Sequence, residues 1–139
     1  MAGEYEVSGV AVPETIDLLH QLLAEARTDH PSLSEEDMSC VETAVIEIAG
    51  NIVEHAPPDQ TVVYTFRLLV HDDQVVVVLT HSGPEVVLDG VPEMPDDPMA
   101  ESGRGLPLAE ASVDELRHEF TDDQNIWTLV RRRSAQAPA

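Results

Sequence analysis

The sequence has 139 residues, of which 42% are hydrophobic, and this predicts a folded domain rather than a disordered chain. Seven basic residues, all arginine, stand against 27 acidic ones, so the formal net charge is −20 at pH 7. Such a charge disfavours direct binding to nucleic acids and anionic membranes, because both depend on cationic side chains that neutralise phosphates. The single cysteine excludes an internal disulfide. The N-terminal segment lacks the pattern of a signal peptide and no apolar run is long enough to span a membrane, so we expect a cytoplasmic protein.

The spacing of apolar residues predicts the secondary structure in chain order. Pro13 suits the first turn of a helix, and Ser34 followed by Asp37 resembles an N-terminal capping box. Pro57 and Pro58 end the second helix. The predicted elements are a strand over 4–12, helices over 13–27 and 34–56, strands over 61–70 and 74–81, a short helix over 106–113, and strands over 114–120 and 125–133.

A segment rich in proline, glycine and acidic residues, 82–105, interrupts this order and predicts a loop. Loops of this length inside a compact domain are usually functional or mobile. The short turns between neighbouring strands favour antiparallel pairing, and helices against one face would bury the sheet. We therefore predict a two-layer α/β sandwich with helices on one face of a mixed or antiparallel sheet. It forms a single domain over 1–133, followed by a disordered tail over 134–139.

The second predicted helix is apolar around most of its circumference and carries one narrow polar strip. Glu47 and Asn51 lie in this strip four residues apart, with Gly50 between them. The strip is open to two interpretations, a surface that simply faces water or the wall of a binding site. A glycine inside a helix costs about 1 kcal/mol relative to alanine and often marks a close approach, which favours the second.

The end of the long loop is the second candidate site. Gly103, Arg104 and Gly105 come directly before a predicted helix that begins near Leu106. Backbone N–H groups at a helix N-terminus favour an anion such as phosphate, although glycine-rich turns are also common without any ligand. The absence of lysine from the sequence excludes a Walker P-loop, and Leu108 stands where a dinucleotide fingerprint needs its third glycine.

Four segments in order, EIAGNIVEHA, HSGP, GRGLPL and WTLVRRR, together resemble the Bergerat-fold ATP-binding module of histidine kinases. The short form of the chain is most similar to bacterial anti-sigma factor serine kinases, and the resemblance extends from about residue 13 to 133. It implies ATP and Mg²⁺ as cofactors. It also implies that Asn51 coordinates the magnesium and that Glu47 is the general base for a substrate serine. Further nucleotide contacts are implied at His81, Gly83, Gly103, Arg104, Gly105, Leu106 and Thr128, with the loop over 84–102 as a lid.

One position departs from the family pattern. The HSGP box normally begins with an aspartate that accepts a hydrogen bond from the adenine amino group, and here it begins with His81. Two function classes stay open. The first is an ATP-dependent serine kinase that phosphorylates an anti-sigma-factor antagonist and sequesters a sigma factor. The second is a nucleotide-free or non-catalytic regulatory binding module of the same fold. The resemblance also implies a homodimer, to which the apolar first helix is one candidate contributor. A histidine-kinase catalytic domain is disfavoured because the surroundings of His20 do not resemble a phospho-acceptor box.

Overall fold

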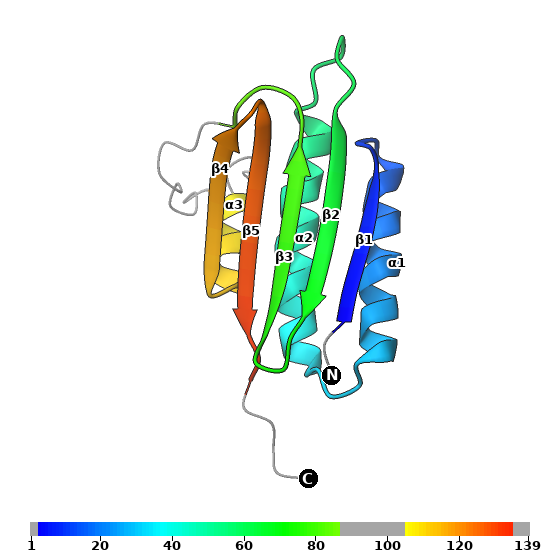
Figure 1. Cartoon of the computed structure of the whole chain (residues 1–139), viewed down its shortest axis with the longest axis vertical. Coiled ribbons are helices and arrows are strands. Elements are labelled where there is room, and N and C mark those ends of the chain that lie inside the picture. Colours follow the sequence, from blue (N-terminus) through cyan, green and yellow to red (C-terminus); the bar gives the residue numbers. More distant parts are fainter. Residues whose placement is uncertain (1–2, 87–104, 135–139) are drawn as a thin grey trace, which may run out of the picture.

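A computed structural model describes residues 3–86 and 105–134, which form a five-stranded sheet covered on one face by three helices (Figure 1). The element order confirms the order predicted from the sequence. The elements are β1 Gly3–Val10, α1 Glu14–Asp29, α2 Glu35–Glu54, β2 Val63–Val70, β3 Gln74–His81, α3 Gly105–Ser112, β4 Glu115–Thr121 and β5 Gln124–Arg132. None of the described helices is long and apolar enough to cross a membrane.

The sheet has the strand order β1-β2-β3-β5-β4, and every neighbouring pair is antiparallel. This decides between the mixed and antiparallel sheets that the sequence left open. The last strand, β5, lies between β3 and β4. The helices lie behind the strands in Figure 1, so the other face of the sheet is turned towards the viewer. The architecture is therefore the predicted two-layer α/β sandwich.

Tight turns between successive strands account for the antiparallel pairing. In the β2–β3 turn the backbone N–H of His71 donates to the carbonyl of Gln74. The β4–β5 turn places Asp122 and Asp123 at φ of 52° and 61°. Two consecutive central residues with positive φ are typical of a type I′ turn, whose twist matches that of the flanking strands. Both turns lie where the sequence predicts them.

The start of α2 has the N-terminal half of the predicted capping box. The side chain of Ser34 accepts a hydrogen bond from the backbone N–H of Asp37 at 3.0 Å, which satisfies one of the free donors of the first turn. The helix ends at Glu54, two residues earlier than predicted, with His55 as its cap. Pro57 and Pro58 follow that cap.

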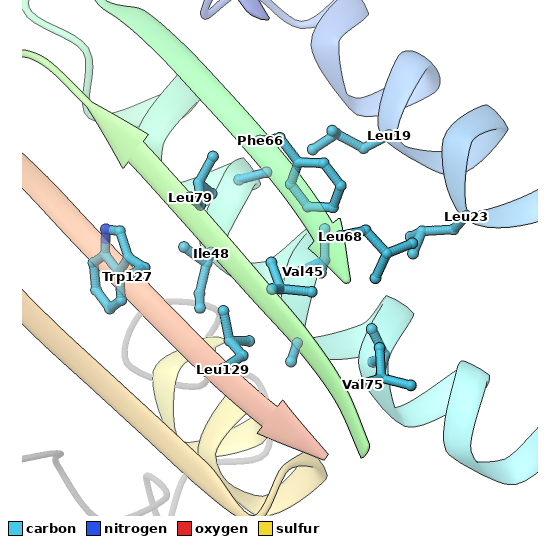
Figure 2. Packing of buried hydrophobic residues seen from close by; sticks show 14 of the residues in the cluster. Leu19, Leu23, Val45, Ile48, Phe66, Leu68, Val75, Leu79, Trp127 and Leu129 are labelled. Atoms are coloured by element: carbon cyan, nitrogen blue, oxygen red, sulfur yellow. The ribbon is translucent and has the colours of Figure 1, made fainter. Parts of the chain in front are cut away.

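The core lies between the helices and one face of the sheet. Figure 2 shows side chains of α1 and α2 packed against those of β2, β3 and β5. Leu19 and Leu23 of α1, Ile48 of α2 and Phe66 of β2 are fully buried, and Trp127 of β5 is 2% exposed. Residues of β2 and β3 alternate between this core face and the open face, because successive side chains of a strand point to opposite sides of the sheet.

A charged junction joins the end of β5 to the start of α2. Asp37 is 1% exposed, and its carboxylate accepts hydrogen bonds from Arg131 Nε at 3.0 Å and from the backbone N–H and hydroxyl of Ser134. Arg131 also donates to the carbonyl of Ser112 at the end of α3. Burial by itself raises the pKa of the Asp37 carboxyl, but hydrogen bonds from Ser134, Ser34 and Arg131 outweigh it and hold the pKa below its ordinary value. Ser134 is thus fixed, and the rest of the predicted tail lies outside the described residues.

Candidate functional site

The polar strip of α2 is accessible in the folded protein. Glu47 and Asn51 are each half-buried, one helical turn apart on the same side of α2. Within the described part of the chain, neither side chain forms a hydrogen bond. A Cβ added at Gly50 would meet no described atom within 4 Å, so the helix backbone is open to close approach there. A carboxylate and a carboxamide are therefore presented together, with free bonding capacity and room beside them.

The glycine-rich segment precedes a helix that packs against α2. Gly105 begins α3, Leu106 lies in its first turn, and α3 contacts α2. The fully buried side chain of Ala109 joins α3 to the common core. Gly103 and Arg104 lie outside the described residues, as does most of the predicted lid. The structure thus brings the helix after the glycine-rich segment to the helix that carries Glu47 and Asn51.

His81 ends β3 on the core side of the sheet and is 4% exposed. The indole N–H of Trp127 donates to its Nε2 at 3.0 Å, and its Nδ1 lies 2.9 Å from the carbonyl oxygen of Ser82. An indole nitrogen can only donate, so Nε2 is the acceptor and the proton of the neutral ring sits on Nδ1. Burial lowers the pKa of His81, which favours this neutral form. Both ring nitrogens are therefore engaged by the protein itself.

Asn125 is a buried residue of this region that the sequence prediction missed. The register pairs it directly with His81, and it is 0% exposed. Its side chain accepts from the backbone N–H of Val86 at 2.8 Å and donates to the carbonyl of Pro84 at 3.0 Å. Asn125 thus fastens the segment after β3 to β5. The signal in the sequence was an asparagine in the same alternating series as Trp127 and Leu129, where an apolar residue is expected.

His118 of β4 completes a small polar cluster with these residues. Its Nε2 lies 2.9 Å from Asn125 Oδ1, which can only accept, so the histidine donates. The imidazole also packs against Trp127, with ring centroids 4.6 Å apart. Together His81, Trp127, His118 and Asn125 tie the ends of β3, β4 and β5 into one connected arrangement.

The last two predicted site residues, Gly83 and Thr128, lie in different parts of the sheet region. Gly83 directly follows Ser82 and has a φ of +101°, which side chains rarely adopt, so glycine is required there. Thr128 neighbours Trp127 on β5 and therefore points to the opposite, open face of the sheet. The structure does not bring Thr128 together with His81 or α2. On β5, Asn125 and Trp127 lie on the same side of the sheet as His81. Thr128 follows Trp127 directly and so lies on the other side.

Comparison with known proteins agrees with this architecture. Residues 10–131 match the family described as the histidine kinase-like ATPase domain. No curated protein sequence matches the chain. Among solved structures, the RsbU and RsbW domains of Rv1364c from Mycobacterium tuberculosis are similar, with a TM-score of 0.66 and 20% sequence identity. That match covers 99% of this chain and 35% of the solved chain, so the likeness concerns the fold of one part of a larger protein. With the family match extending over most of the described strands and helices, the chain belongs to the histidine kinase-like ATPase domain family.

Proposed function

We propose that the protein is an anti-sigma regulatory factor that acts as an ATP-dependent serine kinase. Its substrate would be an anti-sigma-factor antagonist, and a sigma factor would be its second partner. The observation that carries this proposal is the pair Glu47 and Asn51, half-buried on one side of α2 without a described hydrogen-bond partner. The likeness to a solved structure that contains an RsbW domain supports the regulatory part of the proposal.

Asn51 and Glu47 of α2 are residue types that suit magnesium-dependent phosphoryl transfer. Mg²⁺ prefers oxygen ligands and is usually held by few protein groups, and the carboxamide oxygen of Asn51 is one such ligand. In this proposal the carboxylate of Glu47, one turn away, accepts the proton of a serine hydroxyl as that oxygen attacks. When bound, ATP would supply the phosphoryl group and Mg²⁺ would neutralise its charge. The cation matters more than usual here, because the chain carries a net charge of −20 that repels a free nucleotide.

His81, at the position where the family has an adenine-binding aspartate, fits the adenine base poorly. This supports a second candidate function. An adenine amino group needs an acceptor, but Nε2 of His81 already accepts from Trp127 and Nδ1 carries the donor proton towards Ser82. A nucleotide would bind without that contact, and buried polar contacts of this kind carry much of the selectivity of a site. The second candidate is therefore a regulatory binding module of the same fold that does not turn over ATP.

Calorimetric titration with ATP and magnesium distinguishes the two candidates. For the kinase, we expect the wild type to bind, Asn51→Ala to lose most of that binding, and Glu47→Gln to bind as the wild type does. Glu47→Gln should then fail to transfer labelled phosphate to a serine of a purified antagonist protein. Absence of binding by the wild type, with binding created in His81→Asp, would establish the non-catalytic module instead. If none of these variants binds ATP, the kinase proposal is wrong.

A further inference from the structure

The segment that follows β3, residues 82–86, lies outside regular secondary structure and is bonded to strands on both of its sides. Towards β2, the backbone N–H of Ser82 donates to the carbonyl of Val63 at 3.0 Å. The hydroxyl of Ser82 accepts from the backbone N–H of Val63 at the same distance. His81 adds a third contact, because its Nδ1 donates to the carbonyl of Ser82. The beginning of the segment is therefore fixed.

Asn125 of β5 fixes the end of the segment. Its amide oxygen accepts from the backbone N–H of Val86 at 2.8 Å, and its amide nitrogen donates to the carbonyl of Pro84 at 3.0 Å. The oxygen also accepts from Nε2 of His118, which holds the amide group in this orientation. Asn125 is 0% exposed, and a buried amide is stable only while its hydrogen bonds are made. The burial of Asn125 and the conformation of the segment therefore depend on each other.

Packing alone does not explain an asparagine at this position. Trp127 and Leu129, the next two residues on the same side of β5, are large hydrophobic residues, and each is 2% exposed. An apolar side chain at position 125 would fill space in the core without needing partners, whereas a buried amide costs free energy unless its hydrogen bonds are made. Two of the groups that bond to Asn125 are backbone groups of the segment. The amide is therefore suited to holding the segment.

The segment borders the proposed nucleotide site. Figure 1 shows the end of β3 and the C-terminal end of α2 at the same end of the molecule, and Asn51 lies in the last turn of that helix. Gly83, between the two attachment points, has a φ of +101°, and an added Cβ would lie 3.4 Å from the side chain of Val62. A glycine in such a conformation allows a ligand to approach the backbone closely. The fixed segment thus presents backbone groups at the end of the molecule where α2 ends.

From these contacts we infer that Asn125 is a positioning residue for nucleotide binding. The inference rests on the proposed function and on the nucleotide contact that the resemblance implies at Gly83. Asn125 is buried and does not touch the nucleotide itself; it holds the segment in the receptive conformation before the ligand arrives. Such preorganisation raises affinity, because the free energy of ordering the segment is then not subtracted from that of binding.

Hydrogen exchange measured by NMR tests the first step, that Asn125 holds the segment. The backbone N–H of Val86 should exchange at least about tenfold faster in Asn125→Ala than in the wild type. Leu129→Ala is the matched control, because it also removes a buried side chain from the same side of β5 but no hydrogen bond to the segment. It should change the exchange rate of Val86 only by the factor by which it changes the rates of amides in β3, which report global unfolding.

Calorimetric titration with ATP and magnesium tests the second step, that the held segment favours nucleotide binding. We expect Asn125→Ala to bind about tenfold more weakly than the wild type, and Leu129→Ala to bind as the wild type does. Asn125→Asp keeps the acceptor for Val86 but loses the donor to Pro84, so its affinity should lie between the two. Asn125→Asp also replaces Asn125→Ala if that variant does not fold. Thermal unfolding monitored by circular dichroism checks that each variant is folded.

The outcomes separate this inference from the proposed function. If both variants of Asn125 bind ATP as tightly as the wild type, or if Val86 exchanges no faster in them, the inference is overturned while the kinase proposal stands. It is equally overturned if Leu129→Ala weakens binding as much as Asn125→Ala does, because the effect would then be a general loss of stability. A wild type that binds no ATP overturns both.

Discussion

Replacing Asp37 with asparagine removes the negative charge from the junction between α2 and β5. The substitution keeps the size of the side chain but leaves Arg131, which is 19% exposed, without its counter-ion. An amide group also places N–H donors where the carboxylate accepted from Arg131 and Ser134. In either orientation of the amide, one donor group would then face a donor in a largely buried site.

The expected loss of stability is large because Asp37 is only 1% exposed. Removing one partner of a buried ion pair costs about 3–5 kcal/mol, whereas exposed pairs contribute about 0–1 kcal/mol. Small domains have a free energy of unfolding of about 5–15 kcal/mol, so the variant should lose a substantial fraction of it. For a chain of this length, this corresponds to a fall in melting temperature on the order of 10 °C or more.

The effect should also depend on pH. The pKa of Asp37 in the folded protein lies below its ordinary value, so the folded state binds fewer protons than the unfolded chain near that pKa. The stabilisation that Asp37 contributes is therefore complete above pH ~4, which is the pKa of an aspartate in the unfolded chain. It is lost as the pH falls through the pKa of Asp37 in the folded protein. The difference between wild type and Asp37→Asn should be full at pH 7 and shrink below pH ~4.

Urea unfolding at pH 7, 5 and 3 measures this difference directly. Glu36→Gln is the control, because Glu36 precedes Asp37 in the same helical turn and is exposed. It should change the free energy of unfolding by less than about 0.5 kcal/mol. If Asp37→Asn proves as stable as Glu36→Gln at pH 7, or if its deficit is the same at pH 3, the junction does not stabilise the fold as argued.

Three further outcomes follow from local geometry. Ser34→Ala removes the cap of α2 and should lower the free energy of unfolding by about 1 kcal/mol in urea; an unchanged midpoint would contradict the capping role. Gly83→Ala forces a side chain into a φ of +101° and should cost about 1–2 kcal/mol by the same assay; a midpoint equal to that of the wild type would contradict the need for glycine there. In an NMR titration the imidazole of His81 should protonate only below pH ~6.5, and Trp127→Phe should raise that midpoint because it removes a hydrogen bond made to the neutral ring; a midpoint unmoved by the substitution would refute the assigned tautomer.

Most of the fold could be predicted from the sequence because the determining signals are local. The run of consecutive valines in 74–81, the capping pair Ser34 and Asp37, and the prolines after α2 each act within a few residues. These signals fix where elements begin and end to within about two residues. Strand order is different, since the placement of β5 between β3 and β4 depends on contacts between distant segments. The sequence left that order open, as it left the choice between a mixed and an antiparallel sheet.

In the candidate site, too, local relations could be predicted from the sequence and contacts between distant segments could not. Glu47 and Asn51 could be predicted as neighbours because helical periodicity alone puts them on one side of α2. The partners of His81 and Asp37 could not, since Trp127 is 46 residues from His81 and Arg131 is 94 residues from Asp37. Thr128, which the resemblance implies as a nucleotide contact, lies on the open face because a strand reverses the direction of its side chains at every residue. In a strand, assigning a motif position to the neighbouring residue therefore assigns the contact to the opposite face of the sheet.

The position of β5 inside the sheet has a consequence for synthesis of the protein. While a ribosome is still translating residues before 124, β3 has only β2 as a neighbour, and its other edge is unpaired. That edge belongs to a strand with four consecutive valines, Val75 to Val78, and uncharged strands of this kind pair readily with other chains. The nascent chain is thus exposed to aggregation until its final strand emerges and inserts. Translation rate and chaperone supply, rather than the free energy of the finished fold, should then govern how much soluble protein a cell obtains.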